Sequence, residues 1–150
     1  PDPPLEEEPP PAQLPVDAYI PADYIADVAQ RLGYYKRIAG SRTREELKDL
    51  VRELRDRYGQ LPVPLKNLLR IMEARILAHA VGAENITSEG NQLIVKFEPN
   101  RRLKARWQLA LQQQFPGLST HPNALSFPLG KQPLEMLIQV LLALRAQQGA

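Results

Sequence analysis

The order of helical and strand-like segments is the feature that most limits the folds open to this chain. Helical patterns fill most of the sequence up to Gly82, and the remainder combines short hairpin-like strands with two further helices. No strand-helix unit repeats along the chain, which disfavours a doubly wound parallel sheet. We therefore predict an α+β fold with about five helices and short hairpin-like strands in a small, mainly antiparallel or mixed sheet.

Capping and turn residues set the expected limits of these elements. Asp23 is suited to cap a helix from about Tyr24 to Ala39. Thr43 and Glu46 form a capping box for a second helix that ends at Gly59. The remaining predicted elements are a short strand at 15–21, a helix from 65 stopped at Gly82, a hairpin with strands near Ile86 and at 93–97, a helix at 101–115, two strands around 118–121 and 124–127, and a helix at 133–146.

The tyrosine-rich stretch at residues 19–37 permits two interpretations. Its rings stand among Arg31, Lys36 and Arg37, which is typical of platforms for single-stranded nucleic acid. Helical spacing instead favours a core helix, with an apolar face made of Ile25, Val28, Leu32, Tyr35 and Ala39. Tyr34 would then lie on the opposite side, as a possible surface contact for a partner.

The second helix carries a row of carboxylates. Glu46, Asp49, Glu53 and Asp56 recur at a spacing that keeps them on one side of the helix. They can form a solvated surface, in which Glu53 pairs with Arg57 four residues on. They can also form a ridge that docks on arginines of another domain.

A second charged cluster, RRLKARW, spans residues 101–107. Its four cations, Arg101, Arg102, Lys104 and Arg106, could contact phosphates without reading sequence. Basic side chains are disfavoured at a helix N-terminus, and Trp107 is expected on the same inward face as Leu103. These cations are therefore the alternative, nucleic-acid-binding candidates.

Composition and missing motifs narrow the function. The chain has no cysteine, which fits the reducing cytoplasm, and no apolar run of the roughly 18 residues that a membrane span needs. It has no GxxxxGK[ST], GxGxxG, GxSxG or HExxH motif, and His79 and His121 lack companion metal ligands. We predict a soluble, cytoplasmic, non-enzymatic protein without a catalytic residue, cofactor, metal or membrane partner.

The N-terminal segment PDPPLEEEPPPAQLP differs from the rest of the chain. It is rich in proline and acidic, with no Lys or Arg, and we expect it to remain a linker without buried apolar area. The remaining length suffices for one sizeable core. We therefore assign residues 1–15 to a linker and 16–150 to a single domain, excised from a larger protein.

Several motifs together point to a known family. They are an I-P-x-D-Y-I entry, an R-L-x-Y-Y-K-R-I-A helix, a T-x-x-E-L helix that closes in D-R-Y-G, and an L-P-x-P link to a leucine-rich helix. With these motifs the sequence resembles the C-terminal domain of the bacterial transcription-repair coupling factor, Mfd. The resemblance is strongest over residues 14–82 and extends in outline through the final helix.

The resemblance implies a regulatory, autoinhibitory role. The parent would be an ATP-dependent DNA translocase whose motor lies upstream. The domain would dock on the UvrB-like module of the same chain, mask the surface that binds UvrA, and restrain the translocase until RNA polymerase is engaged. UvrA, RNA polymerase and DNA would thus be reached through the parent. By this likeness the expected intramolecular contacts are Glu53 and Asp56, then Asp49 and Glu46. The alternative function is a nucleic-acid-binding accessory module of a helicase-like repair protein.

Overall fold

A computed structural model describes residues 8–150, so Asp2, Glu6 and Glu7 of the predicted linker lie outside the described residues. The chain divides into two compact units: unit 1 holds residues 16–73 together with Glu8, and unit 2 holds residues 9–15 and 74–150. The predicted single domain over residues 16–150 includes parts of both units, and its boundaries stay a prediction. The elements are α1 (Val28–Gly40), α2 (Arg44–Tyr58), α3 (Val63–Val81), β1 (Ala83–Glu89), β2 (Gln92–Phe97), α4 (Ala105–Gln114), β3 (Ser119–His121), β4 (Ala124–Pro128) and α5 (Pro133–Gln148).

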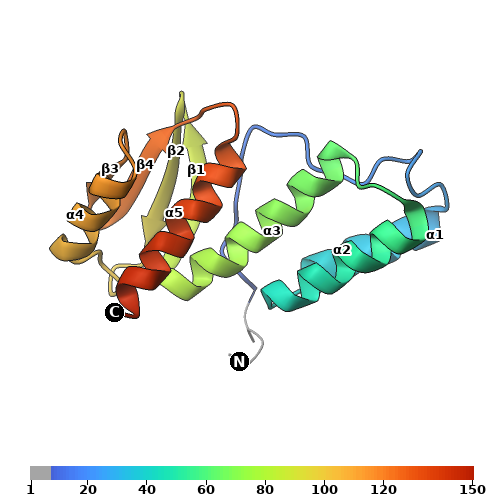
Figure 1. Ribbon diagram of the computed structural model, residues 1–150, viewed down its shortest axis with the longest axis horizontal. Helices are drawn as coiled ribbons and strands as arrows, with labels where there is room; N and C mark the ends of the chain where they lie inside the picture. Colours follow the sequence, from blue (N-terminus) through green and yellow to red (C-terminus); the bar gives the residue numbers. More distant parts are fainter. Residues whose placement is uncertain (1–7) are drawn as a thin grey trace. The chain divides into compact units, whose positions relative to one another are not determined.

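Unit 2 is built on a four-stranded sheet. The strand order is β1-β2-β4-β3, and all neighbouring strands are antiparallel. Alternate residues point to one buried face, as the two-residue period of a strand requires: Ile86, Leu93, Val95, Phe97, Leu125 and Phe127. Helices α4 and α5 lie on one face of this sheet (Figure 1), and their buried leucines join the strand residues in one core. The predicted α+β class is confirmed.

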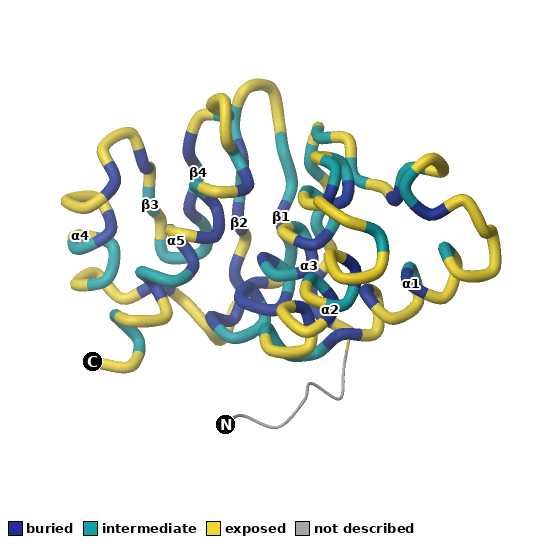
Figure 2. Tube along the Cα trace, turned by 45° about the vertical axis from the view of Figure 1, so that its right-hand side comes forward, coloured by how far each residue is buried: buried dark blue, intermediate teal, exposed yellow. Residues whose placement is uncertain are grey.

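Unit 1 consists of α1, α2 and the first part of α3. The side chain of Asp27 caps α1 by accepting from the Gln30 amide, and Thr43 caps α2 by accepting from the Glu46 amide. Gly59 ends α2 with a φ of +89°, as the sequence predicts. Leu54 and Leu65 are fully buried in this unit, and Figure 2 shows how buried and exposed stretches alternate along its helices.

Two predicted helix starts and one predicted strand are wrong. The first helix starts at Val28 and not at Tyr24, because Asp27 caps it and not Asp23. Segment 15–21 forms no strand, because its amides form isolated hydrogen bonds and do not pair with a neighbouring strand. The Tyr19 amide donates to the Pro64 carbonyl, and the Ile20 amide donates to the Tyr35 hydroxyl. The helix expected from residue 101 begins at Ala105, because the residues between β2 and Ala105 form a turn and not part of the helix.

Part of the predicted linker packs on the sheet. Pro9 and Pro10 are buried, and their carbonyls accept hydrogen bonds from Arg75. Ala12 forms a parallel bridge with Ile86, whose amide donates to the Pro11 carbonyl. The expectation that residues 9–15 bury nothing is therefore wrong, because exposed β1 backbone offers them partners that a sequence pattern does not reveal.

Among the described residues, no helix has the length and apolar character needed to cross a membrane.

Candidate functional site

The predicted ridge carboxylates lie along α2 and differ in solvent exposure. Glu46, Asp49 and Asp56 are exposed, whereas the Glu53 side chain is only 37% exposed. Asp49 pairs with Arg52 at 3.1 Å, and both side chains are well exposed, so this pair binds weakly. A hollow of about 340 Å³ is bordered by Glu46 and Asp49. The spacing prediction that placed these carboxylates on one helix side is compatible with this arrangement.

Glu53 is held inside unit 1. Its carboxylate accepts from the Tyr34 hydroxyl at 2.5 Å and from the two terminal nitrogens of Arg37 at 2.5 and 3.1 Å. These hydrogen bonds, Arg37 first and then Tyr34, lower the pKa of Glu53 to about 2. Arg57 does not form the expected ion pair with Glu53; it donates to the Tyr34 hydroxyl at 2.9 Å. Glu53 therefore joins α1 to α2.

The expectation that Tyr34 lies on the surface is wrong. Its exposure is 3%, whereas Val28 and Leu32 of the predicted inward face are 58% and 55% exposed. The Tyr34 ring packs edge-on against Tyr58 at 6.0 Å, with Arg37 over it at 5.2 Å. Tyrosine can be buried on this side because Glu53 satisfies its hydroxyl, and burial raises its pKa.

Sequence reasoning missed Arg37 and Tyr58 as parts of this network. The available signal for Arg37 was the density of rings and cations at residues 19–37, whereas Tyr58 lies outside that stretch. By itself that pattern fits either a core helix or a nucleic-acid platform. The structure combines rings and cations within one folded unit, where Arg57 also lies over Tyr58 at 5.1 Å.

Glu46 fulfils half of the predicted capping box. Its amide donates to Thr43, as expected, but its carboxylate accepts from the Arg42 amide at 3.2 Å and not from that of Thr43. The side chain of Asp56 forms no ion pair and no hydrogen bond with a residue in the range 8–150. Asp56 and Asp49 are thus the ridge carboxylates that can change partners without loosening the fold.

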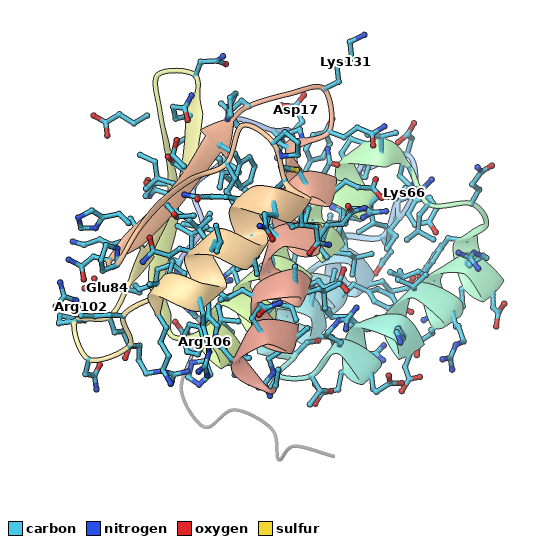
Figure 3. All side chains as sticks on the ribbon, turned by 60° about the vertical axis from the view of Figure 1, so that its left-hand side comes forward. Asp17, Lys66, Glu84, Arg102, Arg106 and Lys131 are labelled. Carbon is cyan, nitrogen blue, oxygen red and sulfur yellow. The ribbon has the colours of Figure 1, made fainter. Side chains whose placement is uncertain are left out.

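The cations of the alternative site lie around the start of α4, in unit 2. Arg101 donates to the Ala80 carbonyl at 3.4 Å, and Arg102 donates to Asn123 at 3.1 Å. Lys104 lies 5.1 Å from the centre of the Trp107 ring. Arg106 is exposed, and Figure 3 labels it together with Arg102. Three of the four cations therefore have internal contacts.

The two histidines lie on different elements of unit 2. His121 accepts from the Asn123 amide at 3.1 Å in the turn between β3 and β4, and His79 lies in the last turn of α3. Within residues 8–150, no group of three or more His, Asp or Glu side chains is placed to hold a metal ion.

Comparison with known proteins places these features in context. The model of the TRCF domain family matches residues 14–107. The transcription-repair-coupling factor of Escherichia coli K12 is 36% identical over 106 residues, which cover 69% of this chain and 9% of that protein. Those of Haemophilus influenzae Rd and Mycobacterium tuberculosis CDC 1551 are each 36% identical over 104 residues, again 69% of this chain, and 9% and 8% of their own length.

The chain thus spans about a tenth of the length of the curated relatives it matches. A solved structure, described as the crystal structure of the C-terminal domain of transcription-repair coupling factor, superposes with a TM-score of 0.75 at 22% identity. The match covers 95% of this chain and 98% of the other, which shows that the two share a fold.

Proposed function

Because this chain belongs to the TRCF-domain family of transcription-repair coupling factors, we propose that it is a non-catalytic regulatory domain of such a protein in the bacterial cytoplasm. It docks on the UvrB-like module of its parent, masks the surface that binds UvrA, and restrains the DNA translocase until RNA polymerase is engaged. UvrA, RNA polymerase and DNA are partners of the parent.

The observation that carries this proposal is the exposed acidic side of α2. Asp49 and Asp56 lie on it without strong internal partners, and Glu46 borders a hollow beside them. Glu53 acts differently: it orders α1 against α2 and so fixes the surface that carries the free carboxylates. Exposed carboxylates that meet arginines provide register and specificity, and they release more readily than a large apolar interface.

The nucleic-acid alternative has less support. Arg101, Arg102 and Lys104 already contact Ala80, Asn123 and Trp107 of unit 2. No row of exposed rings accompanies them, since the nearby Trp107 is partly buried under Lys104. A single-stranded platform would need rings that bases can reach.

Calorimetric titration of the 150-residue chain with the separately expressed UvrB-like module tests the docking. We expect saturable binding. We expect the double variant Asp49→Asn, Asp56→Asn to weaken it about fivefold, because two carboxylates on the acidic side of α2 lose their charge. The effect should shrink at high salt, which screens exposed charges.

The control variant Glu89→Gln, Glu98→Gln removes the same charge from exposed positions of unit 2. It should bind like the unaltered chain. Equal weakening by both variants would point to net charge and remove α2 from the interface. Binding of duplex DNA that exceeds binding of the module would favour the accessory-module alternative.

A further inference from the structure

Unit 1 contains a groove of about 800 Å³ on the other flank of α2. It is lined by side chains of α2, of the turn that follows and of α3: Arg44, Leu47, Lys48, Val51, Arg55, Gln60, Leu61, Lys66, Leu69, Arg70 and Glu73. None of these belongs to the carboxylate side of α2. One helix therefore presents an acidic surface on one side and this groove on the other.

The floor of the groove is aliphatic. Leu47, Leu61 and Leu69 show 5–6% of their surface, and Val51 is half-buried beside them. Most of the area lining a binding groove is apolar in known complexes, where a few buried side chains of the partner provide most of the affinity. This floor is suited to receive leucine-like side chains.

The rim of the groove is basic. Arg44 is engaged by Glu73, with the two charged groups 2.9 Å apart. Lys48 has only an exposed partner, Glu45, at 3.3 Å. Arg55, Lys66 and Arg70 are exposed, and no ion pair joins them to a carboxylate in the described part of the chain. Several like charges around one groove favour an acidic occupant.

We propose that this groove binds an acidic segment of a partner protein, which places aliphatic side chains on the floor and carboxylates against the rim. The lining favours protein over nucleic acid, because it contains no aromatic side chain on which a base could stack. This inference goes beyond the proposed docking, which uses the opposite side of α2, so either can fail alone.

Fluorescence anisotropy with three labelled peptides tests the groove. The first is an amphipathic helical peptide with leucines on one face and glutamates on the other; the second has Gln for each Glu, and the third has Ser for each Leu. We expect saturable binding of the first and much weaker binding of the other two, because the second lacks carboxylates for the rim and the third lacks leucines for the floor.

Charge-reversal variants test whether the Glu/Leu peptide binds in this groove. The variant Lys48→Glu, Arg70→Glu should weaken binding of the Glu/Leu peptide about tenfold, because two rim contacts become repulsive. The matched control Lys36→Glu, Lys131→Glu changes the net charge equally at exposed positions outside the groove, and Lys131 extends from the loop before α5 (Figure 3). The ridge variant Asp49→Asn, Asp56→Asn should bind the peptide like the unaltered chain.

Three results would overturn the proposal. The first is equal binding of the Glu and Gln peptides, and the second is an equal loss of peptide affinity in the two charge-reversal variants. The third is that the Glu/Leu peptide does not bind, whereas a single-stranded oligonucleotide binds and Lys48→Glu, Arg70→Glu abolishes that binding. The last result would assign the groove to nucleic acid.

Discussion

Replacing Gly82 by alanine should destabilise unit 2 by about 2–4 kcal/mol. Gly82 has a φ of +89°, which costs an L-residue strain in itself. A Cβ at this position would also lie 2.7 Å from the Cβ of Arg101. That atom is fixed to the backbone, so the turn after β2 would have to shift. The Arg101 stem therefore covers the end of α3, a structural role beyond its charge.

Gly117→Ala is the matched control, because Gly117 lies in the same unit with a φ of +93°, and a Cβ added there would meet no heavy atom within 4 Å. It should cost about 1–2 kcal/mol, from the backbone alone. Urea unfolding followed by Trp107 fluorescence reports this unit, since Trp107 is the single tryptophan of the chain. Adding Arg101→Gly to Gly82→Ala should recover part of the loss. Equal costs at Gly82 and Gly117 would show that the Arg101 contact is unimportant.

Replacing Glu53 by alanine should destabilise unit 1 by about 2 kcal/mol. The substitution removes the acceptor of the buried Tyr34 hydroxyl and both hydrogen bonds from Arg37. The exposed Asp56 lies on the same helix, and Asp56→Ala should change stability by less than about 0.5 kcal/mol. Tyrosine absorbance reports this unit, because all five tyrosines lie within residues 16–73. Similar losses in both variants would contradict the network.

The same network predicts a pH dependence. The pKa of Glu53 is about 2 in the folded chain, well below its ordinary value. A lowered folded-state pKa stabilises the fold above the unfolded pKa, near 4.3, and this stabilisation is lost as the pH falls toward the folded value. The stability difference between the unaltered chain and Glu53→Ala should therefore narrow between about pH 5 and pH 2. A constant difference would mean that the charge of Glu53 contributes nothing.

Local signals in the sequence predicted most elements of the fold. Thr43, Gly59 and Gly82 mark helix ends by their own chemistry, and the Gly90 turn places the β1-β2 hairpin correctly. The face of α1 could not be found in this way. Both sides of that helix carry apolar side chains, and the choice depends on Glu53, which lies 19 residues from Tyr34. Helical periodicity carries no information on such distant partners.

The sequence predicted that the four carboxylates share one helix, but it could not predict which of them interact within the fold. Spacing placed Glu46, Asp49, Glu53 and Asp56 along one helix. It could not show that Glu53 is committed to Arg37 and Tyr34 while Asp56 stays exposed, because that depends on how α1 packs. The groove beside Lys48 and Arg55 could not be predicted from α2 alone, because α3 supplies part of its lining.

The bridge between residues 9–15 and β1 affects how the chain is connected. It makes residues 16–73 an insertion whose two ends are both anchored in unit 2, where Arg75 binds the carbonyls of Pro9 and Pro10. While unit 2 is folded, an unfolded unit 1 is a closed loop with fewer conformations than a free chain. Unit 2 thereby stabilises the helices that carry the acidic ridge by lowering the conformational entropy of their unfolded state.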